Sequence, residues 1–204
     1  KLKKNLKLDY GDVTDPLNVF EIIKKVRPTE IYNLAAQSHV GISFQKPIYT
    51  TNSIVNGCLN ILEAIRLLNM SRKTKYYQAS SSEMFGNNSK KTLNEKSGFD
   101  PQSVYAISKI YCYHLTRLYR NTYKMFASNG ILFNHESPWR SENFVTKKIV
   151  NGLVDIKFGL RDKIKLGNLY SKRDWGYAKD YVEGMYLMMQ SKNPDNYVLS
   201  TNMT

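Results

Sequence analysis

The sequence predicts an α/β fold with a largely parallel sheet. Short apolar segments alternate with longer segments whose apolar residues recur at helical spacing, which is typical of such sheets. The chain has 204 residues, 42% of them hydrophobic, so a sizeable packed core can form. No internal repeat or low-complexity segment interrupts the alternation.

The first expected elements are a strand and a helix. The segment NLKLDYGDVTD, residues 5–15, predicts a short strand followed by a turn. Asp15 and Pro16 suit the cap and the first position of a helix. We expect this helix to continue to Val26 and to stop before Pro28.

The middle of the chain repeats the pattern. Apolar strands are expected over residues 30–36 and 75–80, with a long helix over about 50–69 between them. The apolar stripe of that helix consists of Ile54, Cys58, Ile61, Leu62 and Ile65. A polar stretch with Gly and Pro, residues 87–103, predicts a loop, and residues 104–123 predict a further helix.

The C-terminal third contains five expected elements. They are a strand over 126–134, a helix over about 143–158, a short strand near 164–167, a helix over about 177–190 and a strand over 196–200.

Clusters of small and polar residues follow four of the expected strands. They are residues 11–12, 34–38, 80–83 and 133–137. Because ligands bind at the carboxyl ends of parallel strands, we expect these clusters to form one ligand-binding rim.

The net charge of +13 attracts anions, which include nucleic acid, a membrane surface and phosphorylated small molecules, but a lysine-rich proteome is a sufficient explanation of this charge. The lysines are scattered, with no zinc-finger spacing and no arginine-rich arm, so we expect no nucleic acid. No run of eighteen apolar residues occurs, so we expect no membrane span. The sequence gives no indication of a metal site.

The chain contains two cysteines, Cys58 and Cys112, which fall in helical patterns and predict buried free thiols. This use of cysteine suits a reducing compartment, and we expect a cytoplasmic protein. The basic N-terminus lacks the apolar middle of a signal peptide, and it does not begin with Met. We therefore expect the chain to start within a longer one.

Tyr105 and Lys109 lie four residues apart on the expected 104–123 helix and share one of its faces. A lysine ammonium favours the phenolate, which can take a proton from an alcohol while hydride leaves the same carbon. Ser81, at a strand end, could hydrogen-bond the same substrate oxygen. A Tyr–Lys pair taken alone is more often a solvated surface pair, and His39 and His114 are interpreted as structural.

The chain resembles the extended short-chain dehydrogenase/reductases and, within them, the GDP-mannose 4,6-dehydratase family. The resemblance covers the chain from about residue 8 to its end, and NGILFNHESP and KRDWGYAKDYVE are far more specific than the Tyr–Lys pair. The matching segments are YGDVTD, PTEIYNLAAQSHV, YQASSSEMFG, YAISK, NGILFNHESP, NFVTKKI, LGN and KRDWGYAKDYVEGM.

The resemblance implies conversion of GDP-D-mannose to GDP-4-dehydro-6-deoxy-D-mannose and water, with NADP recycled in each turnover. Tyr105 would deprotonate the C4 hydroxyl, and Lys109 would hold the ribose and tune Tyr105. Glu83 would remove the C5 proton and help to expel water from C6. The catalytic residues implied are therefore Ser81, Glu83, Tyr105 and Lys109.

Further contacts are implied in the same way. The residues expected to contact the cofactor are Asp12, Val13, Leu34, Ala35, Ala36, Gln37, Ser38, Tyr49, Tyr105, Lys109, His135 and Arg140. Those expected to contact the GDP-sugar are Ser81, Glu83, Asn134, Lys148 and Arg173. The family usually has threonine at Ser81, and it commonly has arginine at Trp139.

The implied fold is an incomplete Rossmann-like doubly wound parallel sheet with part of a smaller substrate-binding region. Residues 1–142 would form the partial NADP-binding domain, and residues 143–204 would contribute to the sugar-nucleotide region before returning to the sheet. No G-x-x-G-x-x-G occurs in these 204 residues, so we expect the chain alone to bind NADP poorly.

The full-length protein is expected to be a homo-oligomer, a dimer or a tetramer. Two alternatives remain: another NAD(P)-dependent nucleotide-sugar dehydratase or epimerase, and a non-catalytic relative with the same fold.

Overall fold

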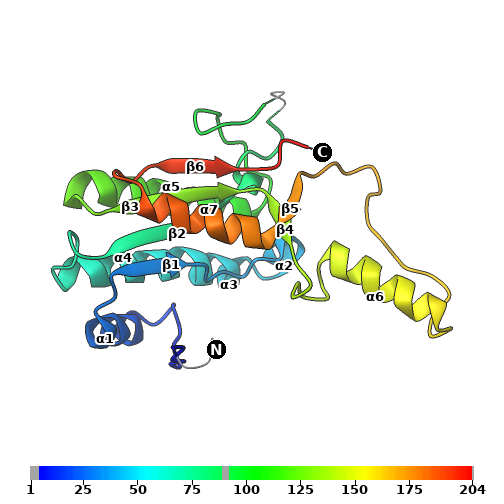
Figure 1. The fold of residues 1–204 in the computed structure, drawn as a ribbon, viewed down its shortest axis with the longest axis horizontal. Helices are drawn as coiled ribbons and strands as arrows, with labels where there is room; N and C mark the ends of the chain where they lie inside the picture. The colour runs from blue at the N-terminus through cyan, green and yellow to red at the C-terminus, as the bar shows by residue number, and fades with distance from the viewer. Residues whose placement is uncertain (1–4, 89–91, 204) are drawn as a thin grey trace.

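The computed structural model describes residues 5–88 and 92–203, and its centre is a four-stranded parallel sheet (Figure 1). The strand order is β1 (Glu30–Asn33), β2 (Lys75–Ser81), β3 (Ala127–Leu132) and β6 (Asn196–Leu199). Helices cover both faces of this sheet, so the expected α/β doubly wound architecture is confirmed.

The first helix, α1 (Pro16–Val26), begins where the sequence predicted. The Asp15 carboxylate accepts hydrogen bonds from the backbone N–H groups of Leu17 and Asn18, at 2.9 and 3.1 Å. Those N–H groups have no partner within the helix, so the cap stabilises its first turn.

The helical region expected over residues 50–69 begins earlier. It comprises α2 (Val40–Gln45), α3 (Pro47–Thr51), a π-helical turn (Asn52–Asn56) and α4 (Gly57–Leu67). Lys46, which separates the first two helices, has φ −131° and ψ 62°. A residue that precedes a proline is driven out of the helical region by the proline ring, and Pro47 then starts the next helix.

Three helices follow in the second half of the chain. They are α5 (Val104–Tyr123), α6 (Val145–Lys157) and α7 (Ala178–Gln190). The bounds of α5 match the prediction, and the Ser103 hydroxyl caps it by accepting from the Ala106 N–H at 3.1 Å. Residues 89–91 of the expected 87–103 loop lie outside the described residues.

Two predicted strands are wrong, at residues 5–12 and near residues 164–167, neither of which is in strand conformation. In the first of these segments Leu6, Leu8 and Tyr10 are exposed, with Tyr10 fully so. Neither segment lies against a sheet edge that would satisfy its backbone groups, and an apolar pattern alone does not make a strand.

Two other predicted strands have different bounds. β1 ends at Asn33, whose side-chain oxygen accepts the Ala35 N–H at 3.2 Å and turns the chain before residue 36. The strand expected over 126–134 is divided, because the chain changes partner after β3. Its continuation, β4 (Asn134–Glu136), pairs in parallel with the unpredicted β5 (Trp175–Tyr177).

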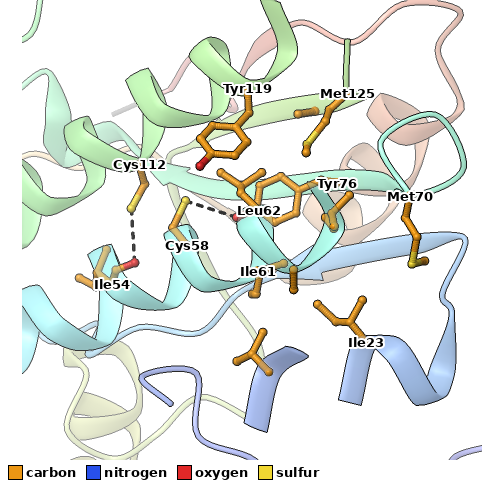
Figure 2. Packing of buried hydrophobic residues seen from close by; sticks show 14 of the residues in the cluster. Ile23, Ile54, Cys58, Ile61, Leu62, Met70, Tyr76, Cys112, Tyr119 and Met125 are labelled. Carbon is orange, nitrogen blue, oxygen red and sulfur yellow. Dashed lines mark hydrogen bonds between the residues drawn. The ribbon is translucent and has the colours of Figure 1, made fainter. Parts of the chain in front are cut away.

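The core lies on both faces of the sheet because neighbouring residues of β2 point in opposite directions. Tyr76 packs among residues of α4 and α5, including Leu62 and Cys112 (Figure 2). Tyr77 packs with residues of α7, including Met189, on the other face. Cys58 and Cys112 are free and completely buried, as the sequence predicted.

The segment between β4 and β5 departs from the compact body. It contains α6, which lies beyond the carboxyl ends of the central strands (Figure 1). The chain then returns through α7 to β6, which pairs with β3 at the edge of the sheet. The domain boundary expected between residues 142 and 143 stays a prediction. Within the described part of the chain, none of the helices is long and apolar enough to span a membrane.

Candidate functional site

A cavity of about 700 Å³ lies at the carboxyl ends of β1, β2 and β3. Residues from three of the four predicted polar clusters border it, namely those at 34–38, 80–83 and 133–137. The predicted rim is therefore confirmed for these three clusters. The fourth, Gly11 and Asp12, does not border the cavity, because the strand expected to carry it to the rim is absent.

Ser81 and Glu83 reach the cavity through a tight turn at the end of β2. The Ser81 hydroxyl accepts the Glu83 N–H at 3.2 Å and starts a 3₁₀ turn, Ser82–Met84. Met84 and Phe85, which follow, are almost completely buried and anchor this turn to the core. The turn holds the Glu83 carboxylate at the cavity wall.

Tyr105 and Lys109 lie on the first turns of α5 and face the same cavity. Tyr105 is 9% exposed and Lys109 is 3% exposed, so the interpretation as a solvated surface pair is wrong. The Lys109 ammonium donates to the Ala79 carbonyl at 2.6 Å and lies 5.6 Å from the centre of the Tyr105 ring. Burial of a cation is costly, and the hydrogen bond to the Ala79 carbonyl offsets part of that cost.

His135 is fixed from two sides. Its Nδ1 lies 2.8 Å from the Phe133 carbonyl oxygen, and its ring stacks on Tyr181 with centroids 4.6 Å apart and planes 20° apart. Tyr181 is 3% exposed, and burial raises its pKa to about 12, so its hydroxyl stays protonated.

Arg140 lies against a carboxylate and an aromatic ring. Its Nε is 3.1 Å from Glu136 Oε2, and its guanidinium carbon is 3.5 Å from the centre of the Phe144 ring. The Thr146 hydroxyl donates to the same Glu136 oxygen at 2.8 Å. Glu136 therefore links the end of β4 to the start of α6 at the cavity wall.

The cavity brings together most of the residues predicted to act in catalysis or binding. Those that border it are Leu34, Ala36, Ser38, Ser81, Glu83, Tyr105, Lys109, Asn134, His135, Arg140 and Arg173. Those that do not are Asp12, Val13, Ala35, Gln37, Tyr49 and Lys148.

The residues outside the cavity make other contacts or face solvent. Asp12 accepts from the Thr14 N–H and hydroxyl, both at 2.8 Å, and the Thr14 N–H is the main cause that lowers the Asp12 pKa. The Gln37 amide donates to the Thr50 hydroxyl at 3.2 Å. Tyr49, on α3, and Lys148, on α6, are exposed.

An apolar wall of the cavity could not be predicted from the sequence. This wall consists of Phe144, Val145, Trp175, Ala178, Val182 and Met185. Only the short β4–β5 pairing brings Trp175 to the cavity, and a three-residue strand carries no usable periodicity.

The two histidines interpreted as structural make structural contacts. His39 caps α2 by accepting the Ile42 N–H at 3.3 Å, and it also borders the cavity. The ring of His114 makes edge contacts with Tyr113 and Phe99. The described residues contain no group of three or more His, Cys, Asp or Glu that could hold a metal ion.

Sequence comparison identifies the family. The family model for GDP-mannose 4,6 dehydratase matches residues 1–204. The chain is 50% identical over 197 residues to a GDP-mannose 4,6-dehydratase of Sinorhizobium fredii, covering 97% of this chain and 56% of that protein. It is 49% identical over 204 residues to a GDP-mannose 4,6 dehydratase of Dictyostelium discoideum, covering 100% and 57%.

Solved structures agree on the fold. RMD from Pseudomonas aeruginosa, complexed with NADPH, superposes with a TM-score of 0.87 at 21% identity, covering 95% of this chain and 66% of that one. DesIV, a dTDP-glucose 4,6-dehydratase from Streptomyces venezuelae with NAD and TYD bound, gives a TM-score of 0.81 at 22% identity, covering 92% and 56%.

The chain spans about half the length of the curated relatives that it matches. The match nevertheless extends over all 204 residues and includes the segments that form the cavity. The chain belongs to the GDP-mannose 4,6-dehydratase family.

Proposed function

We propose that the protein containing this chain converts GDP-D-mannose to GDP-4-dehydro-6-deoxy-D-mannose and water. The observation that carries the proposal is that Ser81, Glu83, Tyr105 and Lys109 all border one cavity. Relatives at about 50% identity that bear the name GDP-mannose 4,6-dehydratase support this choice of substrate.

The cavity residues suit a nicotinamide dinucleotide, and we propose NADP. Small side chains, Ala36 and Ser38, border the cavity beside the end of β1 and permit close approach of a flat ring. Lys109, Arg140 and Arg173 bring positive charge to its wall, which suits a diphosphate. When bound, a nicotinamide would supply the hydride acceptor for C4 of the hexose and the hydride donor for C6, where hydride addition is accompanied by a proton at C5.

The oxidation at C4 requires a base at the hydroxyl. Tyr105 takes this proton, and the buried Lys109 ammonium lies 5.6 Å from the centre of its ring. The Ser81 hydroxyl donates a hydrogen bond to the oxygen that becomes the C4 carbonyl.

The elimination requires a second base, because the C4 carbonyl acidifies the neighbouring C5 proton. Glu83 removes this proton and delivers a proton to the leaving C6 hydroxyl, so that water departs. A 4-epimerase has no elimination step, so a carboxylate at the cavity wall favours dehydration over epimerisation. The retained set of four groups also favours catalysis over a non-catalytic role.

We further propose a cytoplasmic homo-oligomer that recognises GDP-mannose through Asn134 and Arg173. Ile107, Tyr111 and Leu118 are exposed at helical spacing on α5, which supports contact with a second copy. Light scattering of the full-length protein tests this, since Ile107→Glu is expected to lower the measured mass.

The reaction is tested with the full-length protein, NADP and GDP-mannose, by mass spectrometry for a product lighter by one water. Glu83→Gln and Tyr105→Phe are expected to lose product formation by at least about a hundredfold while remaining folded. The matched controls are Glu142→Gln and Tyr186→Phe, which lie outside the cavity. Wild-type turnover in Glu83→Gln would show that another group is the base.

A further inference from the structure

The hydrogen bond at His135 determines which of its nitrogens carries the proton. Nδ1 lies 2.8 Å from the Phe133 carbonyl oxygen, which can only accept. Nδ1 must therefore donate, and in the neutral ring Nε2 is left as an acceptor. Among the described residues no hydrogen bond to Nε2 is found, and His135 borders the cavity.

Tyr181 supports the imidazole from behind. The two rings stack with centroids 4.6 Å apart, and Tyr181 itself does not border the cavity. The hydroxyl of Tyr181 is buried and has no hydrogen-bond partner among the described residues. Its contribution to this arrangement is therefore the face of its ring.

Gly176 makes room for that ring. It is the residue of β5 that pairs in register with His135 of β4. A Cβ atom at position 176 would lie 2.3 Å from Cε2 of Tyr181 and 3.0 Å from its Cζ. Any larger residue would therefore displace Tyr181 and remove the support beneath His135.

We propose that Tyr181 and Gly176 are positioning residues that hold His135 as its Nδ1–H tautomer, with Nε2 directed to accept from a bound dinucleotide. The donor would be an amide N–H or a ribose O–H, which are the groups that such a ligand offers. The claim that Nε2 accepts a hydrogen bond from a dinucleotide is the ligand half of this inference, and it rests on the proposed function. The claim that Tyr181 and Gly176 hold the tautomer is the positioning half, and it rests on geometry alone.

The positioning half is tested by ¹⁵N NMR of histidine-labelled protein above about pH 8, where imidazole is neutral. The chain has only three histidines, and His135→Gln assigns the signal. We expect the Nδ1–H tautomer in the wild type and in Tyr181→Phe, and a mixture of tautomers in Tyr181→Leu and Gly176→Ala. An unchanged tautomer in both of these variants overturns the proposal.

Met188→Ala is the matched control for lost packing, because Met188 is buried on α7 in the same cluster as Tyr181 but does not border the cavity. It should lower stability and keep the tautomer. A tautomer change in Met188→Ala as large as that in Tyr181→Leu overturns the specific role of Tyr181.

The ligand half is tested by titrating NADP into the full-length protein. Tyr181→Leu should weaken NADP binding about three- to tenfold, the loss of one hydrogen bond, and Tyr181→Phe should retain it. Equal affinity of Tyr181→Leu and wild type overturns the ligand half. The wild-type protein could show the Nδ1–H tautomer of His135 and yet bind no dinucleotide. That result overturns the proposed function and the ligand half, and it leaves the positioning half standing.

Discussion

Glu136 illustrates how one side chain can fix the wall of a cavity. Its carboxylate accepts a hydrogen bond from the Thr146 hydroxyl and forms an ion pair with Arg140, whose guanidinium also stacks on the Phe144 ring. The side chains of Glu136 and Arg140 are 17% and 32% exposed, so solvent screens their interaction only in part. The motif that contains Glu136 was recognised in the sequence, but this linking role was not, because it depends on contacts between β4 and α6.

We predict a measurable coupling between Glu136 and Arg140. A double-mutant cycle with Glu136→Gln and Arg140→Gln should give an interaction free energy of about 0.5–1 kcal/mol in urea unfolding. Glu142→Gln combined with Arg140→Gln is the control, because Glu142 contacts Asn151 instead. A coupling indistinguishable from zero for the first pair would contradict the linking role.

A second residue-scale prediction concerns the buried amide of Gln78. Its oxygen accepts from the Asn33 amide at 3.0 Å and from the Tyr76 hydroxyl, and all three residues are nearly inaccessible. Gln78→Leu leaves two buried donors short of an acceptor and should cost about 2–4 kcal/mol of unfolding free energy.

Gln102→Leu is the control for this change, since Gln102 is exposed and, among the described residues, donates only to the Asp100 carbonyl. Denaturant unfolding of both variants measures the difference. Equal stability of Gln78→Leu and the control would show that the network contributes little. This buried network could not be predicted from the sequence, because Asn and Gln are usually surface residues. Only the pairing of β1 with β2 brings Asn33 and Gln78 together.

At the scale of elements, local signals determined where α1 and α5 begin, whereas tertiary contacts determined β4 and β5. Asp15 and Ser103 are capping residues, and both helices begin where these residues predict. The segment 5–12, by contrast, has strand composition without a strand partner. β4 and β5, three residues each, exist only because they pair with each other.

The Ser103 cap should matter to the site as well as to α5. Ser103→Ala removes the acceptor for the Ala106 N–H, and we expect a loss of about 1 kcal/mol of stability. Because Tyr105 lies in the first turn of the same helix, fraying should also lower turnover more than this small stability loss explains.

Restoring the acceptor separates the two effects. Ser103→Asp should recover both unfolding free energy and turnover, because aspartate caps helices as well as serine does. Ser71→Ala, in the turn that follows α4, serves as a control for removal of a hydroxyl. Full activity in Ser103→Ala would contradict the link between the cap and Tyr105.

At the scale of the whole molecule, parallel topology explains why much of the site could be predicted. Strand ends of one parallel sheet meet at one edge, so Leu34, Ser81 and Asn134 converge although they are distant in sequence. The cavity wall from α7 and the contacts of α6 could not be predicted, because they depend on how the segment after β4 returns to the sheet.

The charge of the whole chain sets its response to acid. The net charge is +13, and several of its 17 acidic residues make ion pairs or hydrogen bonds. The Glu63 carboxylate accepts hydrogen bonds from Arg66 Nε and Nη2, at 2.8 and 2.7 Å. These hydrogen bonds hold the Glu63 pKa below its usual value. A hydrogen bond from the Gln190 amide similarly lowers the pKa of Glu30.

A carboxylate with a lowered pKa contributes stability that is complete above its unfolded pKa and is lost as pH falls through its folded pKa. We therefore predict that the urea midpoint falls as pH decreases below about 4.5, and that Glu63→Gln falls less steeply because it lacks this contribution. Each protonation also adds to the positive charge, so added salt should moderate the decline by screening repulsion.

Glu21→Gln is the control, because Glu21 forms an exposed ion pair with Lys24, and this variant should follow the wild-type slope. A Glu63→Gln curve parallel to that of the wild type would assign the acid sensitivity to general repulsion alone, since that effect depends on total charge and not on any single carboxylate.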